Sequence, residues 1–168
     1  MSDTNPASRL NPTTWPLSFK VPLMVAVNND VPAKTLKEFV DLAKAKPGQV
    51  SFAYASTSQQ VSSEVLASMA GIQMNHIPYK GSAQAVTDLL GGQVSAAMPG
   101  LAAMRGHIRE GRARALAVTG AKRAGAAPEI PTMAESGLKG YELYVWMGML
   151  APKGTPAPVV ERLHRRLV

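Results

Sequence analysis

The sequence predicts an α/β fold, an open β-sheet with helices packed on both of its faces. Short β-prone runs alternate with segments of helical apolar period along most of the chain. One stretch, residues 76–98, reads by itself as strand, turn, helix and strand. At 168 residues with 46% apolar side chains, the chain is long enough for one domain with a substantial core. We therefore expect a sheet of about five strands.

The stretch HIPYKGSAQAVTDLLGGQVSAAM, residues 76–98, carries the clearest local signals. A proline removes a ladder donor at the end of its first strand. Lys80, Gly81 and Ser82 follow with a cation, an unrestricted backbone and a hydroxyl. The hydroxyl is suited to cap a helix that begins near Ala83. A Gly-Gly pair then ends the helix, and an alternating apolar run predicts the second strand.

The other expected elements follow the same alternation. Expected strands cover residues 21–27, 50–54, 113–119 and 141–150. Expected helices cover residues 34–46, 57–69, 101–108 and 156–168, with a short helix after residue 132. Thr57 with Gln60, and Thr132 with Glu135, have the spacing of capping boxes. We expect residues 1–20, which contain three prolines, to form an irregular arm, and residues 21–168 to form a single α/β domain.

The charge composition admits two interpretations. The chain has 18 Lys and Arg against 11 Asp and Glu, a net charge of +7 and a pI near 9.9. This balance favours anionic partners, but a low content of acids in an Ala-rich sequence explains it more simply. We expect no nucleic-acid partner, because the cluster from Arg105 to Arg114 has no interleaved aromatic residues for base stacking.

Several chemistries are excluded or unsupported. The absence of cysteine excludes disulfides, thiol nucleophiles and thiolate metal sites. His76, His107 and His164 lack a metal-binding spacing, and no Gly-x-Ser-x-Gly motif accompanies any serine. We expect no enzyme activity, no cofactor and no metal. No apolar run reaches membrane-spanning length, and the polar, proline-rich N-terminus does not have the pattern of a signal peptide.

Four long segments together resemble a known family. They are VPAKTLKEFVDLAKAKPGQVSFAY at 31–54, HIPYKGSAQAVTDLLGGQVSAAM at 76–98, GRARALAVTGAKRAGAAPEIPTMAESGLKGYE at 111–142 and WMGMLAPKGTPAPVVERL at 146–163. Their content, order and spacing resemble the periplasmic solute receptors of tripartite tricarboxylate transporters, often called Bug receptors.

The resemblance implies one lobe of a two-lobed fold of the type II periplasmic-binding-protein kind. The chain is similar mainly to the second lobe, with crossover strands near 21–27 and 144–150 and a C-terminal helix at 156–168 that is truncated relative to the family. The resemblance also implies a periplasmic location and non-catalytic binding of a small organic carboxylate as part of solute uptake. Membrane subunits of a transporter are the implied protein partners.

The resemblance places one ligand contact in the turn formed by Ser56, Thr57, Ser58 and Gln59. Hydroxyl groups beside the free amides of a helix start suit a carboxylate, and the helix dipole favours negative charge there. Gln60 stands where the family often carries a histidine. The alternative role for this turn is simply to cap the helix.

Two further turns complete the implied site. Lys80, Gly81 and Ser82 offer positive potential, amides and a hydroxyl, or else form only a tight turn. Pro99 and Gly100 lie where the family usually carries a polar residue, and here only backbone groups are available. We expect any bound anion to lie at the amides of residues 55–59 and 80–82.

Two other functions remain as alternatives. The first is a receptor-derived self-association module that no longer binds ligand, because a lobe without its partner would expose apolar surface and strand edges around 21–27 and 144–150. We therefore also expect a homodimer. The more remote alternative is a hydrolase that uses a serine in residues 56–58 with a distant histidine.

Overall fold

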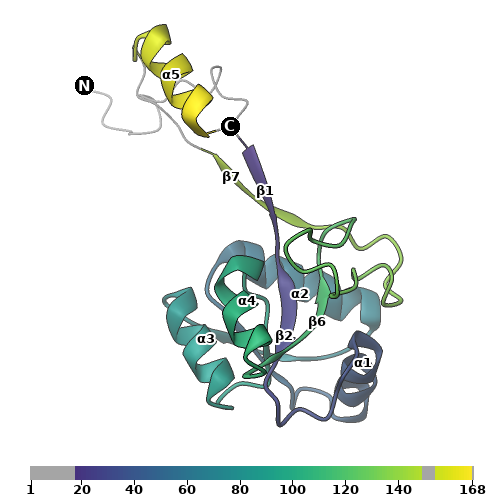
Figure 1. Cartoon of the computed structure of the whole chain (residues 1–168). Helices are drawn as coiled ribbons and strands as arrows, with labels where there is room; N and C mark the ends of the chain where they lie inside the picture. The colour runs from purple at the N-terminus through teal and green to yellow at the C-terminus, as the bar shows by residue number, and fades with distance from the viewer. Residues whose placement is uncertain (1–17, 149–153, 168) are drawn as a thin grey trace, which may run out of the picture. The chain divides into compact units, whose positions relative to one another are not determined.

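The computed structural model describes residues 18–148 and 154–167 (Figure 1). The chain divides into two compact units. One is the continuous segment Pro22–Val145, and the other combines the two ends of the chain, residues 1–21 and 146–168. The domain that we expected to run unbroken from residue 21 to residue 168 is therefore divided near residue 145.

The larger unit is built on a five-stranded sheet, which confirms the expected strand number. Its strands are β2 (Met24–Val27), β3 (Ser51–Tyr54), β4 (Asn75–Pro78), β5 (Ala96–Ala97) and β6 (Arg114–Val118), arranged in the order β4-β3-β5-β2-β6. Strand β3 is parallel to both β4 and β5, whereas β2 is antiparallel to both β5 and β6. The sheet is therefore mixed, with one reversed strand inserted among parallel ones.

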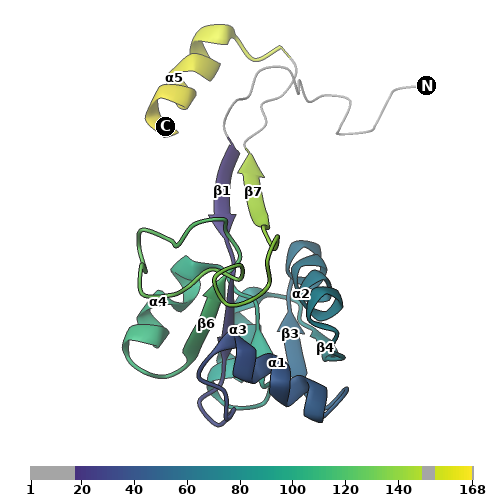
Figure 2. The same ribbon diagram turned by 90° about the vertical axis from the view of Figure 1, so that its right-hand side faces the viewer.

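Helices cover both faces of this sheet, as the alternation predicted (Figure 2). Helices α1 (Leu36–Ala45) and α2 (Thr57–Ala70) pack into one apolar cluster with Val25 of β2. Helices α3 (Ser82–Leu90) and α4 (Leu101–Arg109) pack into a second cluster with Met24. Because successive residues of a strand point to opposite faces, β2 contributes side chains to both cores.

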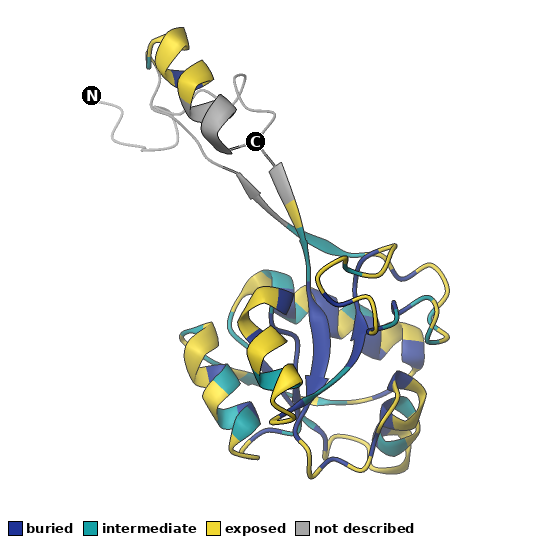
Figure 3. Cartoon of the chain, viewed as in Figure 1, coloured by how far each residue is buried: buried dark blue, intermediate teal, exposed yellow. Residues whose placement is uncertain are grey.

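Strand β2 is buried along its whole length, as the dark segment in Figure 3 shows. The expectation that the region 21–27 would expose apolar surface is therefore wrong for Leu23 to Val27, which are at most 4% exposed. These residues lie between β5 and β6 rather than at an edge. The partners of β2 are about 70 to 95 residues away along the chain, so no local pattern could reveal its central position.

The core is made largely of small side chains, as the low aromatic content of 5% predicted. Ala26, Ala53, Ala96 and Ala97 are all at most 3% exposed and occupy neighbouring strands. The buried Tyr141 is an exception, and its hydroxyl donates to the Ser62 carbonyl at 2.8 Å. Burial raises the pKa of this tyrosine to about 12. The phenol is therefore neutral and serves as a donor that satisfies a helix carbonyl.

The Thr132 and Glu135 capping box forms, but it does not start a helix. The Thr132 amide donates to the Glu135 carboxylate at 2.7 Å, and the Glu135 amide donates to the Thr132 hydroxyl at 3.0 Å. The segment that follows consists of turns, and Gly137 adopts a φ of 107°. Because Gly137 adopts this positive φ only two residues after Glu135, a helix that starts at the capping box cannot continue beyond its first turn.

A two-stranded sheet joins β1 (Ser18–Pro22) with β7 (Tyr144–Gly148). Residues 18–20, which we expected in an irregular arm, are thus the start of a strand whose partner lies far along the chain. The expected C-terminal helix is α5 (Ala157–Leu167). Residues 1–17 of the expected arm, residues 149–150 of the expected last strand and residue 168 lie outside the described residues. Among the described helices, none is long and apolar enough to cross a membrane.

We expect Leu66→Ala to lower the free energy of unfolding by about 2–5 kcal/mol, because Leu66 is fully buried against the sheet and its truncation leaves a cavity. Met69→Ala on the same helix is the matched control, since Met69 is 43% exposed, and should cost at most about 0.5 kcal/mol. Urea unfolding followed by circular dichroism measures both. Equal losses for the two variants would contradict the assignment of the core face of α2.

Candidate functional site

Three helices begin at one edge of the sheet. Strands β3, β4 and β5 are parallel, so their carboxyl ends lie at the same edge, and α2, α3 and α4 follow them directly. The chain passes from β3 to β4 on one side and then from β4 back across β3 to β5. In open α/β sheets this change of direction opens a crevice outside the carboxyl ends of the strands, where ligands bind. All nine predicted site residues lie within or beside these three helix starts.

Helix α2 begins with a side-chain N-cap one residue earlier than expected. Ser56, not Thr57, is the N-cap, and its hydroxyl accepts from the Gln59 amide at 3.3 Å. In return the Gln59 side-chain oxygen accepts from the Ala55 amide at 2.6 Å. Ser56 has the extended backbone that an N-cap requires, whereas Thr57 is already helical. Gln59 is buried, and its side-chain oxygen is engaged in this structural role.

The next two residues of α2 have free polar groups. The hydroxyls and backbone amides of Thr57 and Ser58 donate to no other group in the described part of the chain. Thr57 is exposed and Ser58 is half-buried. Amides in the first turn of a helix have no partner within the helix, so these groups are open to water or to an anion.

Helix α3 begins at Ser82, so the expectation that Ser82 caps a helix starting near Ala83 is wrong. Gly81 is the N-cap, with extended backbone at a φ of −163°, and no side chain caps this helix. The first-turn amides of α3 are therefore uncapped, and the Ser82 side chain is exposed beside them. The exposed Lys80 adds a positive charge one residue before the N-cap.

Helix α4 also begins with a glycine N-cap, Gly100, and without a side-chain cap. The preceding Pro99 is buried, and its carbonyl accepts from the Met24 amide at 3.0 Å. Gly100 forms a bridge with Leu23. These bonds hold the turn of Pro99 and Gly100 against the start of β2. The polar groups that this turn can present to a ligand are the first amides of α4.

The carboxyl end of β6 lies at this same edge and was not included in the predicted site. The Thr119 hydroxyl accepts from the Leu23 amide at 2.9 Å, and the Thr119 carbonyl accepts from the Leu143 amide at 2.9 Å. The Ala121 amide donates to the Tyr144 hydroxyl at 2.8 Å. The segment after β6 is therefore tied to both chain segments that lead out of the larger unit. The sequence signal that could have revealed this part of the edge is Thr119, a polar residue directly after the buried strand.

Gly120 allows this arrangement by lacking a side chain. A Cβ atom at Gly120 would lie 3.0 Å from a ring carbon of Tyr144, closer than such contacts normally permit. Tyr144 thus packs on the loop after β6. The side chain of Trp146 lies outside the described residues.

The histidines give no support to a catalytic serine. His76 contacts the Glu64 carboxylate at 3.2 Å through Nδ1, and His107 contributes a buried Nδ1 without a partner. In the described part of the chain neither histidine bonds to a hydroxyl of residues 56–58, and no cluster of His, Asp and Glu could hold a metal ion. His76 and His107 therefore do not form a nucleophile and base pair with these serines.

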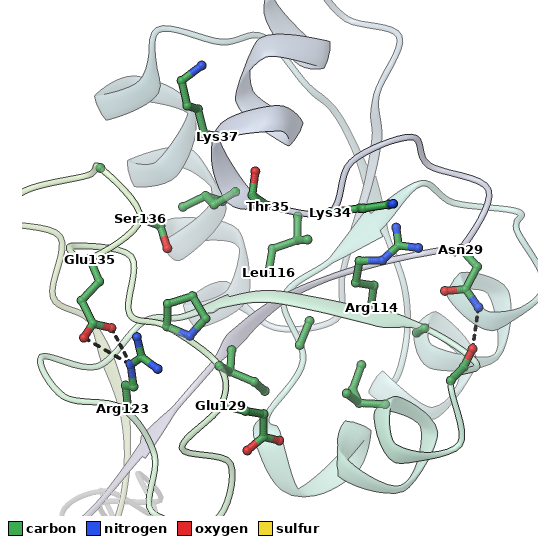
Figure 4. A pocket seen from close by; sticks show the side chains of 18 residues that line it. Asn29, Lys34, Thr35, Lys37, Arg114, Leu116, Arg123, Glu129, Glu135 and Ser136 are labelled. Carbon is green, nitrogen blue, oxygen red and sulfur yellow. Dashed lines mark hydrogen bonds and ion pairs between the residues drawn. The ribbon is translucent and has the colours of Figure 1, made fainter.

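A hollow of about 990 Å³ lies elsewhere, along β6 and the start of α1 (Figure 4). Its cations are largely engaged. Arg114 donates to the carbonyls of Val31 and Ala33, and Arg123 pairs with the Glu135 carboxylate at 2.9 Å. The Thr132 amide, followed by Arg123, holds the pKa of Glu135 below its usual value. Both arginines of this hollow are therefore occupied by contacts within the protein.

Comparison with known proteins identifies the class. A family profile described as "Tripartite tricarboxylate transporter family receptor" matches residues 8–167. The BugT protein of Bordetella pertussis is 38% identical over 149 residues, which are 88% of this chain and 46% of BugT. The structure of R. palustris Rpa4515 with adipate has a TM-score of 0.88 and 30% identity, and the match covers 97% of this chain and 55% of that one.

A second solved structure, MatC from Rhodopseudomonas palustris with bound malate, has a TM-score of 0.78 and 26% identity, over 88% of this chain and 51% of MatC. The fold is thus that of a periplasmic solute-binding protein. The chain belongs to the receptor family of the tripartite tricarboxylate transporters. Members of this family are periplasmic solute receptors, which are not enzymes. The chain spans about half the length of the relatives that it matches.

We expect Gly81→Ser to stabilise the ligand-free protein by a few tenths of a kcal/mol, because a serine with this extended backbone would cap α3 and there is open space around the Cβ position. Thermal unfolding compared with wild type measures the effect. Gly100→Ser is the matched change at α4, where the N-cap is also a glycine in open space. A lower melting temperature for Gly81→Ser would show that the start of α3 is not an accessible helix terminus.

Proposed function

We propose that this chain binds a small organic carboxylate at the helix starts of α2 and α3, without catalysis and as part of solute uptake. One observation carries the proposal: adjacent parallel strands end at the same edge, where the first amides of α3 lack any side-chain cap. Uncapped amides and the positive end of the helix dipole form an anion site without further groups. The adipate and malate found in two similar structures support the ligand class.

Each predicted site residue has a specific role in this proposal. The amides and hydroxyls of Thr57 and Ser58 hydrogen-bond one end of the ligand, while Ser56 and Gln59 hold the turn in shape. The amides and hydroxyl in the turn from Gly81 to Ser82 bind a carboxylate oxygen, and Lys80 contributes positive potential.

Pro99 and Gly100 form a wall of the site, fixed to β2, that presents backbone amides only. We propose that the ligated protein then delivers its ligand to the membrane subunits of a tripartite transporter, in keeping with the family of the chain. The periplasm, where members of the family work, is the location that we propose for this chain.

Isothermal titration calorimetry with adipate and malate tests the proposal. We expect wild type to bind at least one of them and Gly81→Ser to bind it about fivefold to tenfold more weakly, because the new hydroxyl competes with the ligand for the α3 amides. Gly100→Ser should weaken binding less, since the proposal assigns the main contacts to α2 and α3. Absence of binding to a panel of dicarboxylates, or equal binding by wild type and Gly81→Ser, would count against the proposed site.

Self-association is a second candidate function, supported by one surface of α2. Val61 is 49% exposed and Met69 is 43% exposed, and with the half-buried Val65 they form a stripe at i, i+4 and i+8. The opposite face of the same helix buries Ser62 and Ser63, whose hydroxyls bond to carbonyls one turn earlier. An outward apolar stripe on a helix is typical of a contact with another protein surface.

Light scattering over a concentration series tests a homodimer formed through this stripe. We expect a dimeric mass that falls toward the monomer in the double variant Val61→Gln and Met69→Gln, because both side chains are exposed and their replacement removes the apolar contact. Lys37→Gln together with Lys44→Gln provides a matched pair of exposed changes on α1. A monomeric wild type at high concentration would exclude this function.

A further inference from the structure

Tyr79 joins the two candidate turns at their bases. Its amide donates to the Tyr54 carbonyl at 2.8 Å. Tyr54 ends β3 directly before the first turn, and Tyr79 follows the end of β4 directly before Lys80. This bond extends the parallel ladder between β3 and β4 by one residue, and it ties the start of the α2 turn to the start of the α3 turn.

The side chain of Tyr79 then fastens α3 to the same point. Its hydroxyl donates to the Asp88 carboxylate at 2.8 Å, and its half-buried ring packs against the cluster that contains Ala85 and Leu89. Asp88 lies six residues after Ser82, which corresponds to about 9 Å along a helix axis. The backbone bond of Tyr79 holds the start of α3, and the bond from its hydroxyl to Asp88 holds a point near the helix end. Together these two bonds fix the direction of the helix axis.

Helix stability alone does not account for Asp88. A carboxylate in the last turn of a helix meets the negative end of the dipole, which disfavours it by a few tenths of a kcal/mol or more. In the described part of the chain no basic residue pairs with Asp88, and its hydrogen-bond donor is the Tyr79 hydroxyl. Burial, and then this bond, raise the pKa of Tyr79, so its hydroxyl keeps its proton as donor.

We propose that Tyr79 and Asp88 form a positioning pair that aims the first-turn amides of α3 at the ligand carboxylate. This inference rests on the proposed function, and it assigns to neither residue a contact with the ligand. The pair sets the orientation of the turn from Lys80 to Ser82 relative to the α2 turn. It therefore governs how well one carboxylate meets both sets of amides.

Titration calorimetry with adipate on the full chain tests the pair. We expect Tyr79→Phe and Asp88→Ala each to weaken binding about threefold to tenfold, and the double variant to weaken it no further. Asp88→Asn should bind within about twofold of wild type, because its side-chain oxygen still accepts from the tyrosine. Additive losses in the double variant would overturn the pairing.

Tyr141→Phe is the matched control for a general loss of stability. It removes a buried tyrosine hydrogen bond in the same unit, that to the Ser62 carbonyl, which lies on α2 and not on α3. We expect it to lower the melting temperature and to leave the adipate affinity unchanged. An equal loss of affinity in Tyr141→Phe and Tyr79→Phe would show that Tyr79 acts only through stability.

A ligand-free measurement separates this inference from the proposed function. In nuclear magnetic resonance spectra without ligand, Tyr79→Phe should shift the backbone amide signals of residues 80–85, Asp88→Asn should shift them less, and those of residues 100–103 should stay in place. If wild type binds neither adipate nor malate, the proposed site fails, and these signals still decide whether the pair positions α3. Unchanged signals at 80–85 in Tyr79→Phe would overturn the positioning role.

Discussion

The parallel pairing of β3 with β4 and β5 is the constraint on which the rest of this structure depends. Parallel neighbours require a crossover, and here each crossover is a helix that must start at the carboxyl edge of the sheet. The pairing thus brings together three turns that are about 20 residues apart along the chain. The amides of those turns point away from their helices because a helix cannot satisfy its own first donors. A set of first-turn amides gathered at one edge follows from topology before any side chain is considered.

The small-residue core allows that edge to form. Alanines occupy both residues of β5, and Ala97 lies between Ala26 of β2 and Ala53 of β3, so α3 and α4 pack onto a face with little side-chain bulk at its centre. One of the larger buried side chains, Tyr141, satisfies a helix carbonyl as it fills space. Helix α2 also buries small side chains, Ser62 and Ser63, whose hydroxyls bond within the helix. Its apolar Val61 and Met69 side chains are exposed instead. The two exposed apolar side chains make the outer face of α2 a candidate contact surface.

The errors in the sequence-based expectations share one physical origin. The α2 N-cap was placed one residue late, because Ser56 and Thr57 are both good caps and only the backbone conformation distinguishes them. Ser82 was taken as a cap, although Gly81 at the extended position makes Ser82 the first helical residue. Residues 21–27 were expected at an exposed surface, whereas β2 lies inside the sheet. In each case the local pattern identified the element, and the backbone arrangement of the folded chain decided its boundary or its environment.

The sequence by itself determined the alternation of strands and helices, the presence of helices on both faces, the glycines that end helices and the family to which the chain belongs. These features depend on residues near one another in the chain, where apolar period, proline and glycine act directly. The tertiary structure alone decided the strand order, the reversal and burial of β2, and the meeting of Tyr54, Tyr79 and Asp88 beside the candidate turns. Those features depend on pairings between segments distant along the chain, where the free energy belongs to the assembled sheet and not to any one segment.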